Sequence, residues 1–281
     1  MDFGFSPEQD MLRKSFSDFL ANECTSDLVK EWFNNERGYS PAIWKKMADL
    51  GWMELICEAV NHKSGTNFLD AVILFEEAGK ALLPSPLFIS AATAGLILSH
   101  IENDNRIKKY ISGISEGKKI FSVGLFNEKG RYDHCKPCVE AVPEENGKYR
   151  ITGIRLFVPY ANSADFLLIC ADVKDKIAGE PTLFAIRAGI AGLTVRPMNT
   201  LYPERKCEVE FKNMIADSSD IVGKIGLGAR YVDDALCPAI VLKCGEMLGG
   251  MRQVFNTTVQ YAKDRHQFGK PLGVLQAVQH H

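Results

Sequence analysis

The spacing of hydrophobic positions changes twice along the 281 residues and divides the chain into three regions. Over residues 1–117 apolar side chains recur every three or four positions, which is the spacing of one helix face. Over residues 118–222 they form short runs of strand length, separated by glycine, proline and asparagine. Over residues 223–281 the helical spacing returns. The pattern therefore predicts a helical N-terminal domain, a β middle domain and a helical C-terminal domain.

Signals that begin and end helices support the first region. Ser6-Pro7-Glu8-Gln9 is a capping box, with proline at the first helical position. Ser40-Pro41 begins a second predicted helix and Gly51 ends it. Phe68 to Leu82 is apolar on most sides, which predicts a buried helix, and Arg106 to Ile114 predicts a shorter amphipathic one. The first two helices present these apolar faces: Leu12, Phe16, Phe19 and Leu20, then Ile43, Met47 and Leu50.

One uncharged stretch resembles a membrane span in composition. Ala81 to Ser99 carries no charged residue, but Pro84 and Pro86 interrupt it near its start. The remaining segment, Leu87 to His100, is too short to cross a bilayer as a helix. We therefore predict a buried helix and no membrane span.

The second region reads as a set of short strands. Asn146-Gly147 is typical of a hairpin turn between two extended runs. Four further runs follow at strand length, and strands at this spacing suggest a small sandwich or barrel. These runs are "DFLLICADV", "PTLFAIRA", "LTVRP" and "CEVEF".

The third region begins with a glycine-rich linker, Gly223 to Gly228, and continues as a long helix. Gly249-Gly250 would let a neighbouring backbone come close. The loop Gly269 to Gly273 then opens another helix, whose Leu275 and Val278 meet no later apolar segment. A packing stripe runs along the long helix through Met247, Met251, Val254, Thr258 and Tyr261.

Composition narrows the class of protein. Hydrophobic residues at 46%, charged residues at 24% and a net charge of −2 are ordinary for a globular protein and argue against a nucleic-acid partner. Eight cysteines without a signal-peptide pattern predict reduced thiols and a cytoplasmic protein. A lone Cys135-Lys136-Pro137-Cys138 beside His134 has no second CxxC, so we predict no metal or redox site there.

Two groups of carboxylates stand in apolar surroundings. Of the adjacent Glu76 and Glu77, we expect one to be solvated at the helix edge. Glu246 is expected to pair with Lys243 or Arg252, because a buried acid needs a partner.

The end of the long helix carries a cation, an amide and an aromatic residue in close succession. Arg265 and Gln267 suit a diphosphate, and Phe268 suits a flat ring beside it. The alternative is an exposed arginine next to a core phenylalanine, and spacing alone favours that alternative.

The chain resembles the acyl-CoA dehydrogenase family along its whole length. The final "YAKDRHQFGKPLGVLQAVQHH" resembles the stretch that closes the family's long helix and opens the next one. "FSPEQDMLRKSFSDFL", "IWKKMADLGWMEL" and "FEEAGKALLPSPLF" resemble its N-terminal landmarks. The resemblance implies an α+β multidomain fold: a helical N-terminal domain, a β middle domain and an incomplete helical C-terminal domain. Because family members continue with more helices, it also implies that the chain is C-terminally truncated.

The family's cofactor is FAD, and the resemblance assigns two sets of contacts to it. Phe126 occupies the position of a family threonine, and Tyr132 that of a family serine. Asp133 matches the family's aspartate. The resemblance also places Tyr132 and Asp133 near the substrate. Phe157-Val158-Pro159 replaces a Trp-Ile-Thr segment and loses its hydroxyl. The expected contacts in the middle domain are Leu125, Phe126, Asn127, Tyr132, Phe157, Val158 and Pro159. The expected contacts to FAD of a neighbouring subunit are Arg265, His266, Gln267, Phe268, Leu275 and Gln276.

The catalytic base is not identified by the resemblance. The family's glutamate lies beyond His281 or, in a minority, at the position of Ala239. Glu246 is seven residues further on, and two helical turns span about 10 Å. We therefore expect little activity from this chain alone, although the parent protein is expected to oxidise an acyl-CoA to its 2,3-enoyl form.

Partners follow from the same resemblance. Electrons would pass to an electron-transfer flavoprotein, and the role of Arg265 requires at least a dimer. One alternative is a non-catalytic subunit of a heteromeric acyl-CoA dehydrogenase, paired with a paralogue. Another is a flavin oxidase or monooxygenase on the same fold. The acyl group itself is left open.

Overall fold

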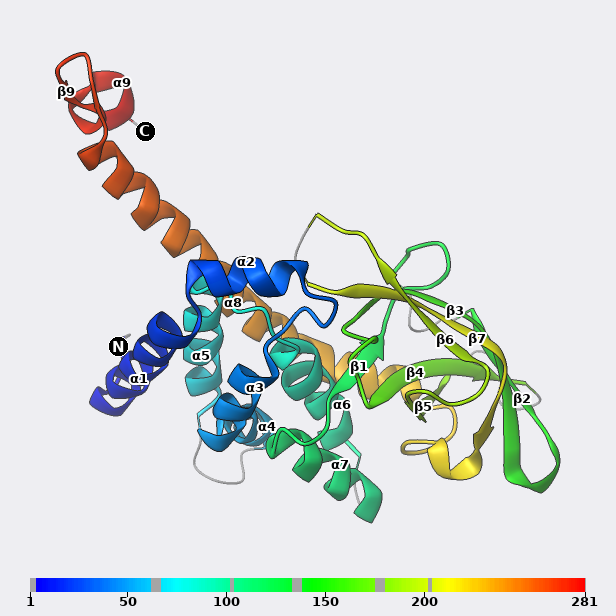
Figure 1. The fold of residues 1–281 in the computed structure, drawn as a ribbon. Helices are drawn as coiled ribbons and strands as arrows, with labels where there is room; N and C mark the ends of the chain where they lie inside the picture. The colour runs from blue at the N-terminus through cyan, green and yellow to red at the C-terminus, as the bar shows by residue number, and fades with distance from the viewer. Residues whose placement is uncertain are drawn as a thin grey trace.

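The computed structural model places a group of helices beside a β-sheet, with one long helix running past both (Figure 1). The C-terminal part of that helix leaves the body of the molecule as an arm and carries the end of the chain with it. The structure describes residues 4–61, 67–101, 104–132, 138–174, 180–201 and 204–280.

The N-terminal helices begin where the sequence predicts. Ser6 caps α1: the Gln9 N–H donates to the Ser6 hydroxyl, and the Ser6 N–H donates to the Gln9 side chain. The segment after Pro86 is buried as predicted, but its first part is a π-helix. The bounds are α1 Pro7–Glu23, α2 Ser26–Asn34, α3 Pro41–Asp49, α4 Trp52–Asn61, α5 Phe68–Lys80, π-helix η1 Phe88–Ala94, α6 Gly95–Ser99 and α7 Asn105–Ser115.

Two predictions for this domain are wrong. Leu50 caps α3 instead of joining its apolar face, and its side chain is 58% exposed. Glu76 and Glu77 are both buried, at 6% and 5% exposure, so neither is solvated at the helix edge. The reason is Arg13 of α1, whose guanidinium lies 2.7 Å from the Glu76 carboxylate and 3.9 Å from that of Glu77. An opposite charge of this kind makes burial of a carboxylate tolerable.

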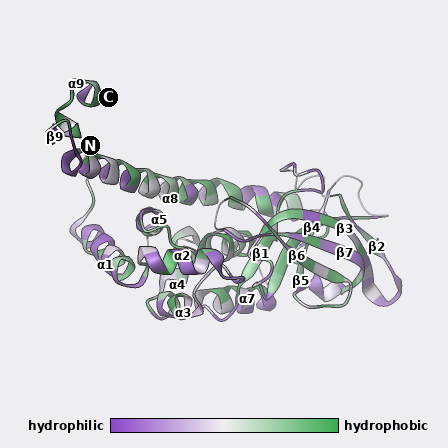
Figure 2. Ribbon diagram, turned by 45° about the horizontal axis from the view of Figure 1, so that its top comes forward, coloured by the Kyte–Doolittle hydropathy of each residue, from purple (hydrophilic) through white to green (hydrophobic). Residues whose placement is uncertain are grey.

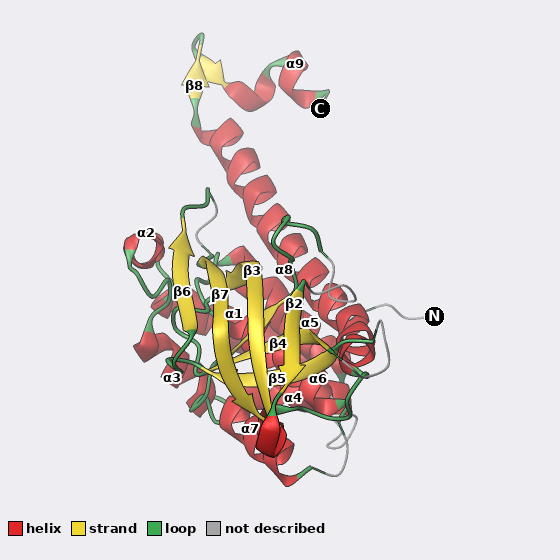
Figure 3. Cartoon of the chain, turned by 90° about the vertical axis from the view of Figure 1, so that its right-hand side faces the viewer, coloured by secondary structure: helices red, strands yellow, loops and turns green. Residues whose placement is uncertain are grey.

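The middle domain is a mixed sheet of seven strands, in the order β1-β4-β2-β3-β7-β6 with β5 paired to β4. In Figure 3, β4 and β5 pass behind β3 and β7. Tyr149 of β3 and Phe184 of β5 meet between these layers, with ring centroids 5.7 Å apart. The strands are β1 Phe121–Gly124, β2 Val139–Pro143, β3 Lys148–Pro159, β4 Phe166–Val173, β5 Thr182–Arg187, β6 Leu193–Met198 and β7 Lys206–Asp217.

The predicted hairpin is confirmed between β2 and β3. Asn146 and Gly147 both have positive φ, at +61° and +71°. Asparagine and glycine tolerate this left-handed conformation better than other residues, which is why this dipeptide turns the chain.

The helices and the sheet share one apolar core. Phe121 of β1 and Phe166 of β4 stack at 5.0 Å, and the ring of Tyr110 of α7 packs against both. The Phe121 N–H donates to the Ser90 hydroxyl in η1 at 3.0 Å. The side of the sheet near β1 is therefore held against the N-terminal helices.

The long helix α8 spans Gly228–Asp264 and packs closely against α5. Its first half is anchored by buried residues such as Leu242, whereas green apolar positions in Figure 2 recur along the projecting part. The predicted packing stripe lies on this arm and is exposed: Met247, Met251, Val254, Thr258 and Tyr261.

A short hairpin and helix complete the arm. The elements are β8 His266–Gln267, β9 Lys270–Pro271, the 3-10 turn η4 Leu272–Val274 and α9 Gln276–Gln279. Within the part of the chain that the structure describes, no helix has both the length and the apolar character needed to cross a membrane.

Candidate functional site

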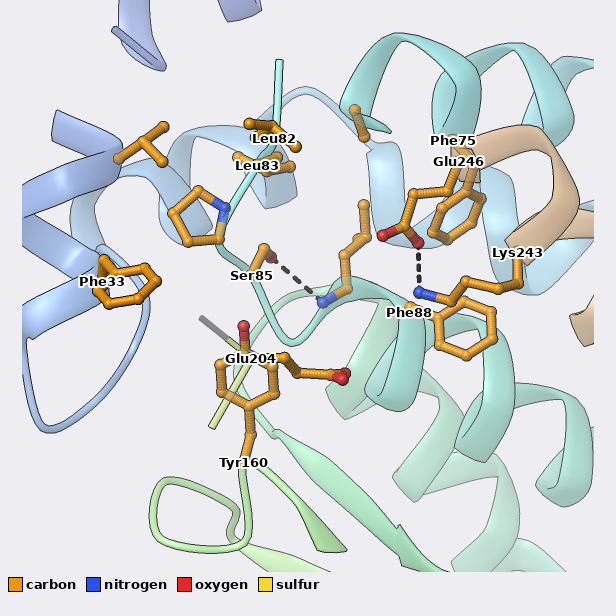
Figure 4. A pocket seen from close by; sticks show the side chains of 14 residues that line it. Phe33, Phe75, Leu82, Leu83, Ser85, Phe88, Tyr160, Glu204, Lys243 and Glu246 are labelled. Atoms are coloured by element: carbon orange, nitrogen blue, oxygen red, sulfur yellow. Dashed lines mark hydrogen bonds and ion pairs between the residues drawn. The ribbon is translucent and has the colours of Figure 1, made fainter. Parts of the chain in front are cut away.

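A cavity of about 280 Å³ lies where α2, the end of α5, the turn before η1, the sheet and α8 meet. Figure 4 shows Phe33 entering from α2, Leu82 and Leu83 from the turn, and Tyr160 from the sheet side. The lining is mostly apolar and its size is at the lower end of small-molecule sites. Its walls are Val29, Phe33, Phe75, Ala78, Leu82, Leu83, Pro84, Ser85, Leu87, Phe88, Tyr160, Glu204, Lys243 and Glu246.

Two charged side chains of α8 stand in this apolar wall. The Lys243 ammonium lies 2.5 Å from a carboxylate oxygen of Glu246, one turn further along the helix. The same ammonium lies 3.9 Å from the centroid of the Phe88 ring, a cation–π contact. The expected pairing of Glu246 is thereby confirmed for Lys243. Arg252 pairs instead with Glu76 of α5.

A third charged group faces the cavity from the sheet side. Glu204 lines the wall and its carboxylate is 2.5 Å from the ammonium of Lys206. Each carboxylate at the cavity therefore has its own lysine. Sequence reasoning missed this site because its walls come from segments far apart in the chain. The i,i+3 spacing of Lys243 and Glu246 in an apolar stretch was the available signal.

At the position where the resemblance expects the base of a minority of the family, this chain has the methyl group of an alanine. Ala239 is 1% exposed within α8, and its methyl side chain supplies no proton acceptor. Glu246 cannot take its place without moving along the helix, since it is two turns away, about 10 Å.

Three of the residues expected near FAD form an aromatic cluster on the middle domain. The ring of Phe126 lies edge-to-face with Tyr132 at 5.6 Å and with Phe157 at 5.8 Å. Phe157 has a φ of +53°, in a bulged part of β3 between Arg155 and Val158. This left-handed conformation is costly for a non-glycine residue and turns the Phe157 ring toward Phe126.

A tight turn closes the stretch between Phe126 and Tyr132. The Asn127 side-chain carbonyl accepts from the N–H groups of Lys129 and Arg131, both at 3.0 Å. The Asn127 N–H donates to the Arg131 carbonyl at 2.9 Å. Asn127 is therefore occupied in holding the turn. Asp133 lies outside the described residues.

The aromatic rings of this cluster fit one requirement of a flavin site, a flat apolar surface for the ring system. The half-exposed rings of Phe126 and Phe157 offer flat contact of the kind an aromatic ring system needs. The side chains of Phe126, Phe157, Val158 and Pro159 hold no hydrogen-bond donor, so polar recognition there would fall to main-chain groups. Leu125 is half-buried beside them.

The second set of expected FAD residues lies on the arm, away from this cluster (Figure 1). Arg265 ends α8 and its side chain is exposed, as are those of His266, Gln267 and Phe268. Leu275 and Gln276 follow at the start of α9. The structure does not bring the two sets together within one chain.

Of the two cysteines in the CxxC motif, Cys138 lies within the described residues. Cys138 is exposed, and His134 to Pro137 lie outside the described residues. No three metal-ligating side chains gather among the residues that the structure describes.

The comparisons with known proteins place the chain in a family. Residues 6–118 match the model of the acyl-CoA dehydrogenase N-terminal domain, and residues 226–281 match that of the acyl-CoA dehydrogenase C-terminal domain. The chain belongs to the acyl-CoA dehydrogenases, a family of flavoprotein oxidoreductases that use FAD, as the resemblance predicted.

Relatives and solved structures agree with that assignment. A short-chain-specific acyl-CoA dehydrogenase of Clostridium acetobutylicum is 27% identical over 99% of this chain and 74% of its own length. Butyryl-CoA dehydrogenase of Megasphaera elsdenii superposes with a TM-score of 0.86 at 21% identity, covering 100% of this chain and 75% of that one. The ChsE4-ChsE5 complex of Mycobacterium tuberculosis gives a TM-score of 0.83 at 24% identity, covering 100% and 73%. These likenesses confirm the predicted fold.

Proposed function

We propose that this chain takes part in the FAD-dependent α,β-dehydrogenation of an acyl-CoA thioester to the 2,3-enoyl form, with electrons passing to an electron-transfer flavoprotein. The observation that carries the proposal is the apolar cavity enclosed by α2, α5, the sheet and α8. An acyl chain has the shape and apolar surface that such a cavity accepts.

In this proposal the cavity residues are assigned to the acyl group, and the middle domain and the arm to FAD. Phe33, Leu83 and Phe88 would surround the acyl group and exclude water from it. Phe126 and Phe157 would contact the flavin ring, and Arg265 with Gln267 would hold the diphosphate of FAD bound by a neighbouring subunit. Bound FAD supplies the acceptor for the hydride that leaves the β-carbon.

The α-proton needs a carboxylate near the α-carbon. At the position on α8 where a base is expected, Ala239 has no carboxylate, and the carboxylate of Glu246 is paired with Lys243. The base would therefore be a carboxylate other than Glu246, in this chain or in another.

A second candidate function is a partner subunit that does not itself catalyse. Ala239 in place of a base and the lack of side-chain donors at Phe126 and Pro159 favour it. In this arrangement Arg265 and Gln267 would serve the flavin of a paralogous chain. One fold neighbour, ChsE4-ChsE5, is described as a complex of two differently named chains.

The visible absorption spectrum of the purified chain tests both candidates. About one FAD per chain, with bleaching of the flavin band when an acyl-CoA is added without oxygen, is the result expected for the dehydrogenase. A colourless protein that added FAD does not colour would contradict it. The partner-subunit function would then require that a paralogue co-purify with the chain and bind FAD more weakly without it.

A further inference from the structure

We propose that Lys243 selects acyl groups that carry a neutral oxygen, as a hydroxyl or a ketone, remote from the thioester. The inference rests on the proposed function, because it assigns a substrate class to the same cavity. It starts from the charged pair that α8 places in a mostly apolar wall.

The position of the Lys243 ammonium is fixed by two neighbours. Glu246 accepts one of its hydrogen bonds, and the face of the Phe88 ring lies below it at 3.9 Å (Figure 4). An ammonium group has three N–H donors. Within the described residues, Glu246 is the one side chain that accepts a hydrogen bond from it. A ligand oxygen in the cavity can therefore accept another.

Partial burial makes the Lys243 ammonium favour ligands that can accept its hydrogen bond. The side chains of Lys243 and Glu246 are 34% and 24% exposed, so both are partly withdrawn from water. A purely hydrocarbon ligand would cover the ammonium further and offer it no acceptor, which is unfavourable for a charged group. A ligand with an oxygen next to the Lys243 ammonium would accept a hydrogen bond from it and so replace the water that the ligand displaces.

The rest of the cavity confines where that oxygen can lie. Phe33, Leu82 and Leu83 form apolar walls on the side away from α8, and Tyr160 closes the sheet side with its ring. The body of the acyl group would pack against these side chains. Its oxygen would then face α8, where Lys243 stands.

The surrounding charges favour a neutral oxygen over a carboxylate. Glu246 and Glu204 both line the cavity, and each is already paired with a lysine at 2.5 Å. A ligand carboxylate would approach two carboxylates, and among the described residues the one ammonium that lines the cavity, that of Lys243, is already shared with Glu246. A hydroxyl or ketone accepts the hydrogen bond without this repulsion.

Calorimetric titration of the full chain with matched CoA thioesters tests the inference. The thioesters share one acyl length and end in a methyl, a methyl ketone, a hydroxyl or a carboxylate, and no electron acceptor is present. We expect the ketone or hydroxyl form to bind at least about tenfold more tightly than the methyl form, the effect of a hydrogen bond to a charged group. In Lys243→Met, which keeps an unbranched side chain but removes the ammonium, this ratio should fall to about one.

Two further variants keep the test decisive. Lys30→Met removes the lysine of an exposed i,i+3 pair with Asp27 and should leave the ratio unchanged. Glu246→Gln keeps an acceptor for Lys243 but removes a negative charge, so the carboxylate form should bind more tightly than to the natural chain.

Three outcomes would overturn the inference. They are equal affinities in the natural chain, a preference that survives in Lys243→Met, and tightest binding of the carboxylate form. Any of these leaves the proposed function standing, because acyl-CoA still binds. Failure of every thioester to bind overturns both.

Discussion

Gly249 of α8 meets the main-chain carbonyl of Glu76 in α5 so closely that a Cβ built on Gly249 would lie 1.8 Å from that oxygen. The reverse contact is similar, since a Cβ on Gly79 of α5 would lie 1.9 Å from the carbonyl oxygen of Glu246. The two helices thus approach through paired glycines. This approach sets the position of α8, and with it the position of Lys243 and Glu246 at the cavity.

Gly249→Ala should therefore separate the two helices. We expect the free energy of unfolding to fall by about 1–3 kcal/mol, the usual cost of overpacking, despite the better helix propensity of alanine. Urea unfolding followed by circular dichroism measures the change. Gly250→Ala is the matched control, because its Cβ would lie 3.7 Å from the nearest atom. Equal effects of the two substitutions would contradict the close approach.

Asp104 caps α7 and should make stability depend on pH. The hydrogen bond from Arg106 lowers the pKa of Asp104, at a side-chain distance of 2.9 Å. A lowered folded-state pKa gives stability that is present above the ordinary pKa of about 4 and is lost as the pH falls through the folded-state value. Arg106 also donates to the Ile221 carbonyl, so this pair links α7 to the segment before α8.

Asp104→Asn isolates the charge, because asparagine is an equally good helix cap. Near neutral pH we expect it to lower the free energy of unfolding by about 0.5–1 kcal/mol, and this difference should shrink as the medium is acidified below the ordinary pKa. Urea unfolding at several pH values measures it. Asp234→Asn, which breaks an exposed 3.8 Å contact with Arg230, should have a smaller effect. A difference that is constant with pH would argue against the ionic contribution.

The cysteines should divide into inert and reactive groups. Burial raises the pKa of Cys24 and of Cys57 to about 11, so at neutral pH their thiolate fraction is very small. Cys138, Cys237 and Cys244 are exposed. Brief treatment of the native chain with iodoacetamide should label the exposed group and spare the buried pair, as peptide mass spectrometry would show. Labelling of Cys57 at the rate seen in the unfolded chain would show that the helical core opens readily.

Arg265→Ala tests the arm as a source of FAD contacts. If the proposed function holds, the dissociation constant for FAD should rise by about tenfold or more, as expected for loss of a charge-assisted bond to phosphate. The free energy of unfolding should stay unchanged, because the Arg265 side chain is exposed. Lys263→Ala removes an exposed charge two residues away and serves as control. An equal loss in both variants would indicate a general charge effect.

The sequence was sufficient where neighbouring residues carry the signal. The capping box at Ser6, the buried helix from Phe68 and the turn at Asn146-Gly147 are local patterns of backbone preference and hydrophobic spacing, and each is found in the structure. The order of helices, strands and helices followed from the same spacing. These features need no knowledge of what lies across the core.

Burial and the shape of the cavity were decided only by tertiary structure. Arg13 reaches Glu76 across 63 positions of sequence, and Arg252 reaches it across 176, so no local pattern could show that both Glu76 and Glu77 are buried. The cavity likewise draws its walls from α2, α5, the sheet and α8, and only their packing places Lys243 over Phe88. The free energy of a charged side chain depends on which groups surround it in space, and the chain order alone leaves those groups unspecified.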